Sequence, residues 1–194
     1  YNSSTKPTNA GSYTVTATIA ATNNYNAASC SDTFTIYRAN ISPSVTMTNW
    51  TYGSTASNPS ISANSGSGTV TYTYTGTVNG GTTNGYNSST KPTNAGSYTV
   101  TATIAQTNNY NAGSCSDTFT INRANISPSV TMANWTYGNT ASTPSINGNS
   151  GGGTYSISYI DASSLQPTDG NPVNAGNYGI TVSIAQTNNY NSGS

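Results

Sequence analysis

Apolar and polar residues alternate one by one over several stretches of the chain. Val70, Tyr72 and Tyr74 alternate with threonines, and a second run of the same kind extends from Tyr98 to Ile104. A period of two is typical of half-buried β-strands, and Val, Ile, Tyr and Thr fit such a pleated surface well. We therefore predict strands over 69–75, 97–104, 118–121, 44–48, 60–63 and 82–87.

The same sequence pattern recurs along the chain. Residues 1–39 return at 86–124 with three changes, an offset of 86 − 1 = 85 residues, and a more divergent copy of one segment lies at 174–191. Such self-similarity indicates a tandem array. We predict the C-terminal part of one repeat over 1–39, a complete repeat over 40–124, and a repeat lacking its last strand over 125–194. The partial repeats at either side suggest a segment of a longer array.

The fold class follows from the short strands and the turns between them. Turn signals such as Asn58-Pro59, Asn79-Gly80 and Ala95-Gly96 separate the strands, and no apolar stripe of helical period is present. Many short strands within a repeat of 85 residues predict an all-β fold made of tandem immunoglobulin-like β-sandwiches.

A tyrosine stands near the start of the penultimate strand of each repeat. Tyr98 follows Gly96 by two residues, and Tyr13 and Tyr178 occupy the same place in the other copies. Immunoglobulin-like domains place a tyrosine corner at this point, in which the hydroxyl bonds to backbone upstream. We predict the same corner here.

Charged residues make up only 4% of the chain, with a net charge of +0 and neither Glu nor His. Nucleic-acid binding needs Lys and Arg to neutralise phosphates, so we exclude a nucleic-acid partner. Membrane insertion of this segment is also excluded, because its apolar runs are far shorter than a membrane span. Disorder is disfavoured by the 15 tyrosines and the many β-branched residues.

The residue inventory also disfavours catalysis. General acid–base chemistry needs a tunable carboxylate, His or Lys in a cleft, and no carboxylate pair recurs between the repeats. We therefore predict that the protein is not an enzyme and carries no cofactor. No metal site is predicted either, since ligands at suitable spacing are absent and the Asn-rich loops offer at most weak carbonyl ligands for Ca²⁺.

The two cysteines, Cys30 and Cys115, occupy the same position in successive repeats. A disulfide requires Cα atoms within about 7 Å, so equivalent sites in a linear array should not pair with each other. Two alternatives remain open. The cysteines are small, partly buried thiols, or they form a cross-link to another chain, which an extracellular location would favour.

The motif NWTYG places a Trp and a Tyr near the start of two repeats, as Trp50 with Tyr52 and Trp135 with Tyr137. Aromatic side chains beside Asn and Thr can form a sugar-stacking platform. The alternative, which we favour from their position near the repeat start, is packing against the junction with the preceding repeat.

Six asparagines match the N-x-[ST] pattern of glycosylation, although many matches arise by chance in a chain so rich in Ser and Thr. They are Asn2, Asn40, Asn49, Asn87, Asn125 and Asn134.

Several longer motifs resemble a known family. WTYG, KPTNAGSYTVTATIA, NNYN and FTI-x-RA, taken in this order, are similar to the bacterial immunoglobulin-like repeats, often called MBG-type, of large surface proteins. This resemblance implies a secreted or wall-anchored bacterial protein with many repeats in series. The family supplies no catalytic residues.

Together these patterns suggest a structural role. Only a few residues separate Ile121 from the next predicted strand near Ser127, too few for a flexible tether, so we predict a semi-rigid rod. Near-zero net charge removes repulsion between chains, and edge strands offer groups for lateral pairing. We expect a segment of an extracellular stalk or filament whose partners are other copies of itself. The alternative is an adhesin whose repeats bind glycans or mucin.

Overall fold

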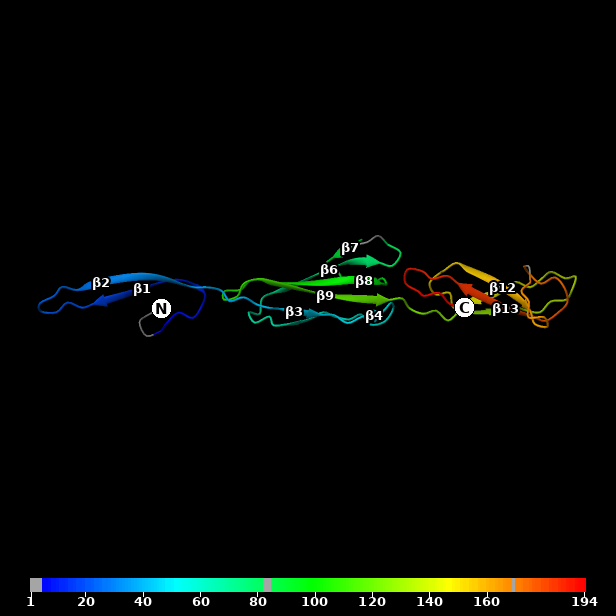
Figure 1. Cartoon of the computed structure of the whole chain (residues 1–194), viewed down its shortest axis with the longest axis horizontal. Helices are drawn as coiled ribbons and strands as arrows, with labels where there is room; N and C mark the ends of the chain where they lie inside the picture. Colours follow the sequence, from blue (N-terminus) through cyan, green and yellow to red (C-terminus); the bar gives the residue numbers. More distant parts are fainter. Residues whose placement is uncertain (1–4, 82–84, 169) are drawn as a thin grey trace. The chain divides into compact units, whose positions relative to one another are not determined.

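The computed structural model describes residues 5–81, 85–168 and 170–194. These residues form thirteen β-strands and no helix (Figure 1). The prediction of an all-β fold is confirmed, and the several sheets are consistent with a β-sandwich. The strands are β1 (Gly11–Ile19), β2 (Ala28–Ile36), β3 (Ser44–Thr46), β4 (Trp50–Thr51), β5 (Ser60–Ser62), β6 (Val70–Val78), β7 (Tyr86–Ser88), β8 (Gly96–Ile104), β9 (Gly113–Asn122), β10 (Ser129–Thr131), β11 (Ser145–Asn147), β12 (Tyr155–Asp161) and β13 (Tyr178–Ile184).

The contacts divide the chain into two compact units that cut across the sequence repeats. The first unit comprises Tyr1–Thr46, Pro59–Thr73 and Val100–Asp117, and the second comprises Met47–Asn58, Tyr74–Thr99 and Thr118–Ser194. Each unit therefore contains the end of one repeat together with part of the next. The repeat boundaries at 39/40 and 124/125 remain a prediction from the sequence.

In the first unit, β1 and β2 form a two-stranded antiparallel sheet (Figure 1). Their register runs from Gly11↔Ile36 to Ile19↔Ala28, and the loop between them is tightened by a hydrogen bond from Thr22 N to Tyr25 O at 2.9 Å. Strands β3 and β5 form a second antiparallel pair. Alternation of Thr and apolar residues supplies the pleated pairing that these strands require.

The middle repeat contains a five-stranded sheet in the order β4-β9-β8-β6-β7. Its edge strand β4 runs parallel to β9, with Trp50 opposite Ile121. The sequence pattern did not predict β4, because a strand of two residues is too short to show alternation. The predicted strand at 82–87 is found as Tyr86–Ser88, and residues 82–84 lie outside the described part.

Aromatic packing around Phe119 forms one part of the core of the second unit, next to the buried residues of the third repeat. The ring of Phe119 stacks on Trp50 at 5.2 Å and on Tyr98 at 5.6 Å, and it meets the edge of Tyr74 at 6.3 Å between ring centroids. Phe119 and Tyr98 are each 2% exposed. Each such pair adds about 0.5–1.5 kcal/mol beyond the burial of its area, so strand β9 holds strands β4, β8 and β6 together.

The tyrosine corner is confirmed in all three copies. The Tyr98 hydroxyl donates to the Asn94 carbonyl at 2.8 Å, and Tyr13 and Tyr178 make the same bond to Asn9 and Asn174 at 2.9 and 3.1 Å. Gly96 is required beside it, since a Cβ there would lie 2.3 Å from the Thr77 carbonyl oxygen.

The third repeat has two two-stranded sheets, β10-β11 and β12-β13. Beyond β12, strand β13 makes an isolated bridge from Ile184 to Gly193. Residues 135–136, the counterparts of β4, are not a strand. No helix among the described residues is long and apolar enough to cross a membrane.

We predict that Tyr98→Phe lowers the free energy of unfolding by roughly 0.5–1.5 kcal/mol, because it removes a buried hydrogen bond. Thermal unfolding followed by circular dichroism measures the loss. Tyr13→Phe is the matched control, since its hydrogen bond is solvent-exposed and should contribute less. Equal losses in the two variants would contradict a special role for burial at Tyr98.

The same tyrosine predicts a loss of stability at alkaline pH. Burial first, and then the neighbouring Tyr86, raises the pKa of Tyr98 above its usual value. A raised pKa in the folded state gives stability that is complete below about pH 10, the unfolded value, and that is lost as pH rises through the folded value. Tyr98→Phe should therefore flatten the fall of the urea midpoint at high pH.

Candidate functional site

The two aromatic residues of NWTYG have different surroundings. Trp50 stacks on Phe119 inside its own repeat, whereas Tyr52 meets the edge of Tyr190 at 5.5 Å, a residue of the following repeat. The expectation that this motif packs against the preceding repeat is wrong. Because β4 runs parallel to β9, it carries Tyr52 toward the end of the repeat where the next one begins.

In the third repeat the same motif is more open. Trp135 is half-buried and Tyr137 is 71% exposed. Both line a groove of about 440 Å³ together with Tyr159 and Tyr178, and neither Trp50 nor Tyr52 belongs to its lining.

A side-chain amide joins neighbouring repeats at the first junction, within the first compact unit. The Asn109 side chain donates through Nδ2 to Asn9 Oδ1 at 2.9 Å and accepts at Oδ1 from the Ala10 backbone N–H at 2.8 Å. An amide side chain can do both at once because it carries a donor and an acceptor. Asn109 therefore clamps the loop that forms the tyrosine corner of the preceding repeat.

The second junction, within the second compact unit, repeats this clamp. Asn189 donates to Asn94 Oδ1 at 3.1 Å and accepts from the Ala95 N–H at 2.8 Å. Asn94 thus serves both sides, since its backbone carbonyl accepts from Tyr98 and its side chain accepts from the next repeat.

The linker between repeats is held by the same loop. Ala39 N donates to Asn109 O, and Asn111 N donates to Ala39 O, both at 2.9 Å. Arg38 Nε donates to Thr107 O at 3.1 Å, and Asn111 Nδ2 donates to Asn40 Oδ1 at 2.8 Å. Through the two backbone bonds, Ala39 of the linker forms an isolated parallel β-bridge with Tyr110.

The equivalent linker at the second junction makes the same bonds. Ala124 pairs with Asn189 and Asn191 through backbone bonds of 2.9 Å, Arg123 Nε donates to Thr187 O at 2.9 Å, and Asn191 Nδ2 donates to Asn125 Oδ1 at 2.7 Å. None of these contacts is an ion pair, so salt should screen them little.

Sequence reasoning missed these junction residues. It predicts only weak Ca²⁺ ligands for the loops that hold Asn109 and Asn189, and it places Arg38 and Arg123 at the repeat junctions without assigning them a bonding role. The recurrence of NAG, TNNYN and RAN in successive copies was the available signal, because it puts the same residue types at both junctions, although the partners are 100 residues apart at the first and 95 at the second.

A small recess accompanies each junction. The first is about 430 Å³ and is lined by residues that include Gly66, Asn109 and Tyr110. The second is about 540 Å³, with Gly151 and Tyr190 in the corresponding places and Tyr52 added. Each glycine is needed, since a Cβ would come within 2.8 Å of the tyrosine ring. The lining is uncharged and offers amides, hydroxyls and an aromatic ring.

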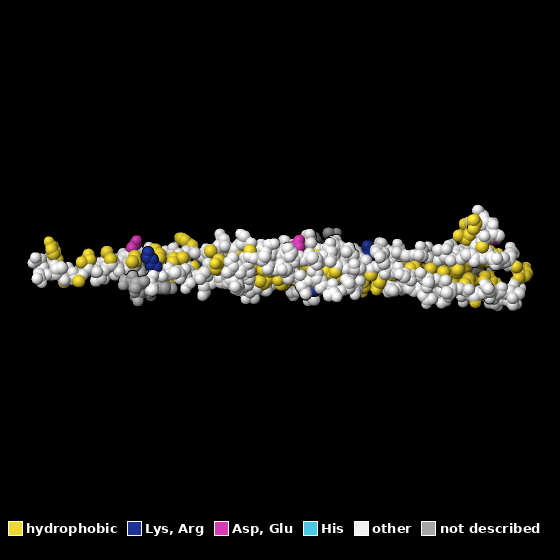
Figure 2. All heavy atoms as spheres, turned by 90° about the horizontal axis from the view of Figure 1, so that it is seen from below, with side chains coloured by type: hydrophobic (Ala, Val, Ile, Leu, Met, Phe, Trp, Pro, Cys, Tyr) yellow, Lys and Arg dark blue, Asp and Glu magenta, His cyan; other side chains and the backbone are white. Residues whose placement is uncertain are grey.

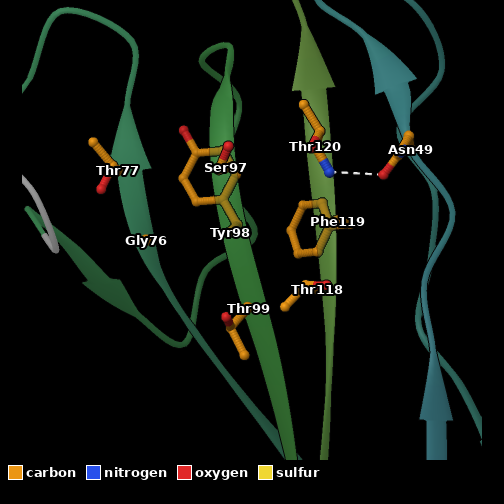
Figure 3. Close-up of a pocket in the computed structure, with 9 residues that line it drawn as sticks. All are labelled: Asn49, Gly76, Thr77, Ser97, Tyr98, Thr99, Thr118, Phe119 and Thr120. Atoms are coloured by element: carbon orange, nitrogen blue, oxygen red, sulfur yellow. Dashed lines mark hydrogen bonds between the residues drawn. The ribbon is translucent and has the colours of Figure 1, made fainter.

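A further uncharged depression, of about 460 Å³, lies over β6, β8 and β9 (Figure 3). Threonine and serine hydroxyls surround it, including Thr77, Ser97 and Thr120. Asn49 Oδ1 accepts from the Thr120 N–H at 2.7 Å, marked by the dashed line in Figure 3. Asn49 thus ties the segment before β4 to strand β9.

The cysteines differ in exposure and are both free thiols. Cys30 is exposed, and Cys115 is partly buried. Burial raises the pKa of the Cys115 thiol above its usual value, which lowers its thiolate fraction and so its reactivity. No group of three or more His, Cys, Asp or Glu side chains that could hold a metal lies among the described residues.

The six candidate glycosylation sites fall into distinct environments. Asn40 and Asn125 accept bonds at the junctions, and Asn49 accepts from β9. Asn87 is exposed on β7 and Asn134 is exposed in the third repeat. Asn2 lies outside the described residues.

We predict that Asn109→Asp loosens the first junction, because a carboxylate cannot donate to Asn9 Oδ1 and would repel it. Losing one hydrogen bond and gaining this repulsion should cost about 1–3 kcal/mol locally. Hydrogen exchange at the Ala39 amide, measured by mass spectrometry, should become faster by tenfold or more.

Asn108→Asp is the matched control, since Asn108 is the exposed neighbour of Asn109 and carries the same change of charge. Exchange at Ala39 that rises equally in both variants would show that charge alone, and not the amide clamp, is responsible.

A comparison with known protein families matches the family model described as MBG domain over residues 1–40 and 43–125. This match covers the first junction and all of the middle repeat (40–124) except residues 41 and 42. Comparisons with curated proteins and with solved structures gave no match.

Proposed function

The chain belongs to the MBG-domain family, and from that premise we propose that it is a structural segment of an extracellular bacterial stalk or filament. In this proposal successive repeats are joined into a semi-rigid rod that presents or separates other parts of the protein. MBG domains are repeat domains of surface proteins, which supports this location.

One observation carries the proposal: the same clamp and the same paired linker occur at both junctions. At the first junction five hydrogen bonds join the neighbours, and a further bond from Asn111 to Asn40 holds the start of the middle repeat beside them. At a net contribution of roughly 0.5–1.5 kcal/mol each, they add up to several kcal/mol. A linker whose backbone is paired in this way has lost most of the freedom that a flexible tether needs.

The nearly uncharged surface supports association with other copies. Charged side chains are few and scattered on the face seen in Figure 2, in keeping with the net charge of +0. Association then meets little electrostatic repulsion. Cys30 is an exposed free thiol, and we include in the proposal a disulfide from it to a cysteine of another chain.

The proposal includes no enzymatic activity. The recesses and the depression over β6, β8 and β9 are lined by hydroxyls, amides and aromatic rings, and general acid–base chemistry needs a group that titrates near the working pH. Binding, rather than catalysis, is the chemistry that such linings support.

Resistance to trypsin tests the rod. The chain holds only two arginines, Arg38 and Arg123, and both lysines precede proline, so cleavage reports on the junctions. We predict that trypsin cuts the native chain after Arg38 at least about tenfold more slowly than it cuts a peptide of residues 34–43, since the paired linker must first open. Cleavage into single repeats at the rate of the peptide would contradict the proposal.

Glycan binding is a second candidate, favoured by the recess at the second junction. Tyr52 and Tyr190 lie there edge to face in an uncharged lining, which suits neutral sugars. A single shallow site binds weakly, but an array of such sites would bind through avidity.

We predict that Tyr52→Ala weakens retention on an immobilised neutral glycan or mucin by roughly tenfold, the equivalent of one lost stacking contact. Tyr137→Ala, the same motif position outside this recess, is the control and should leave retention unchanged. Equal effects, or no retention of the wild-type chain, would exclude the recess as a sugar site.

A further inference from the structure

Strands β4 and β9 are the strands through which the chain enters and leaves the five-stranded sheet. Strand β4 is the first strand of this sheet along the chain, and β9 is the last. They are parallel neighbours, with Trp50 opposite Ile121 and Thr51 opposite Asn122, and all four residues belong to the second compact unit. The chain therefore enters β4 at one end of the pair and leaves β9 at the other end.

Tension along the chain loads this pair in shear. A pull on the chain before β4 and after β9 draws the two strands past each other along their length, because parallel strands have their N-terminal ends together. All contacts between the strands must then yield nearly at once. In an antiparallel pair the same two points would lie at one end, and the bonds would open one after another.

Hydrogen bonds on both sides of Trp50 resist this sliding. Tyr52 N donates to Asn122 O at 2.8 Å, and Thr120 N donates to Asn49 Oδ1 at 2.7 Å (Figure 3). The second bond uses a side chain as its acceptor, and it extends the attachment to β9 by one residue before β4 begins. Each bond crosses from one strand to the other, so neither survives a displacement along the strand direction.

Stacked rings resist the same movement from the core side. The rings of Trp50 and Phe119 lie 5.2 Å apart between centroids and within 14° of parallel, and Phe119 is 2% exposed. A slip of one residue would turn the side chains of β4 to the opposite face. A slip that keeps Trp50 on the core side must therefore cover two residues, about 6.6 Å. That distance takes the indole off the Phe119 ring and exposes its apolar surface.

We propose that the β4–β9 pair, together with Asn49, is a mechanical lock that lets the middle repeat bear tension along the chain. We call it the strand lock. It closes a segment of 121 − 50 = 71 residues, which stays folded while the lock holds. The inference rests on the proposed stalk for the source of the tension, whereas the lock itself rests on the direction and contacts of two strands.

The direction of the pull tests the strand lock. The full chain with Cys30→Ser and Cys115→Ser is held by a tether at each terminus in an optical trap at constant force. We expect the middle repeat to persist and then to lengthen in one step. The segment of 71 residues closed by the lock should release about 250 Å, at roughly 3.5 Å for each residue.

In a second arrangement one tether moves to the other end of β4. Thr55→Cys attaches it at an exposed position shortly after that strand, while the second tether stays at the C-terminus. The force now acts on the same end of both strands. We expect a folded lifetime at least about tenfold shorter at the same force, because the bonds open one after another. Equal lifetimes in the two arrangements would overturn the strand lock.

Two matched variants test the side-chain bond under end-to-end force. Asn49→Ala removes the acceptor of the Thr120 N–H, and it should shorten the folded lifetime by roughly threefold to tenfold, as expected for one lost hydrogen bond. Asn87→Ala makes the same change at an exposed position of β7, the opposite edge of the sheet, and should leave the lifetime unchanged. Equal lifetimes in the two variants would overturn the assignment of Asn49 to the lock.

The rod and the strand lock fail separately. Trypsin cleavage after Arg38 and Arg123 reports whether the linkers between repeats are paired, whereas the lifetime under force reports on two strands within one repeat. A chain that trypsin cuts readily but that holds under end-to-end force would remove the rod and leave the lock. A chain that resists trypsin but opens equally fast in both pulling directions would remove the lock and leave the rod.

Discussion

The packing of Phe119 is the interaction on which the complete repeat depends. Its ring contacts aromatic residues from β4, β8 and β6, so one side chain of β9 closes the core of the second unit. Two residues after Ile121, the same chain reaches Arg123 and the paired linker. Closure of the core and attachment of the next repeat therefore depend on one strand.

With only 4% charged residues, the chain joins its neighbouring repeats to each other without ion pairs. It uses side-chain amides, which satisfy a donor and an acceptor with one group. Isolated surface ion pairs contribute little and weaken with salt, whereas these neutral bonds are largely independent of ionic strength. The clamp also attaches to the tyrosine corner, the loop whose backbone is already fixed by Tyr98. A neighbour therefore meets a preformed surface, which reduces the entropic cost of the contact.

The sequence predicted the strands and the tyrosine corner because both are local patterns: alternation in β8 and a Gly-to-Tyr spacing that recurs in each copy. It failed for β4, whose two residues carry no periodicity, and consequently for the direction in which Tyr52 points. The amide clamps could not be derived either, because Asn109 and Asn9 are 100 residues apart and only the pairing of repeats brings them together.

The central claim is that neighbouring repeats are held in a fixed relation by the clamp and the paired linker. Cys30 and Cys115 both belong to the first compact unit and lie on either side of its junction, so spin labels on the two native thiols report on that junction. The most direct measurement is the distance distribution between these labels, obtained by pulsed electron paramagnetic resonance in dilute solution. A fixed junction predicts one narrow distribution that is unchanged by salt. A broad or multimodal distribution would show that the repeats move independently, and would contradict the account.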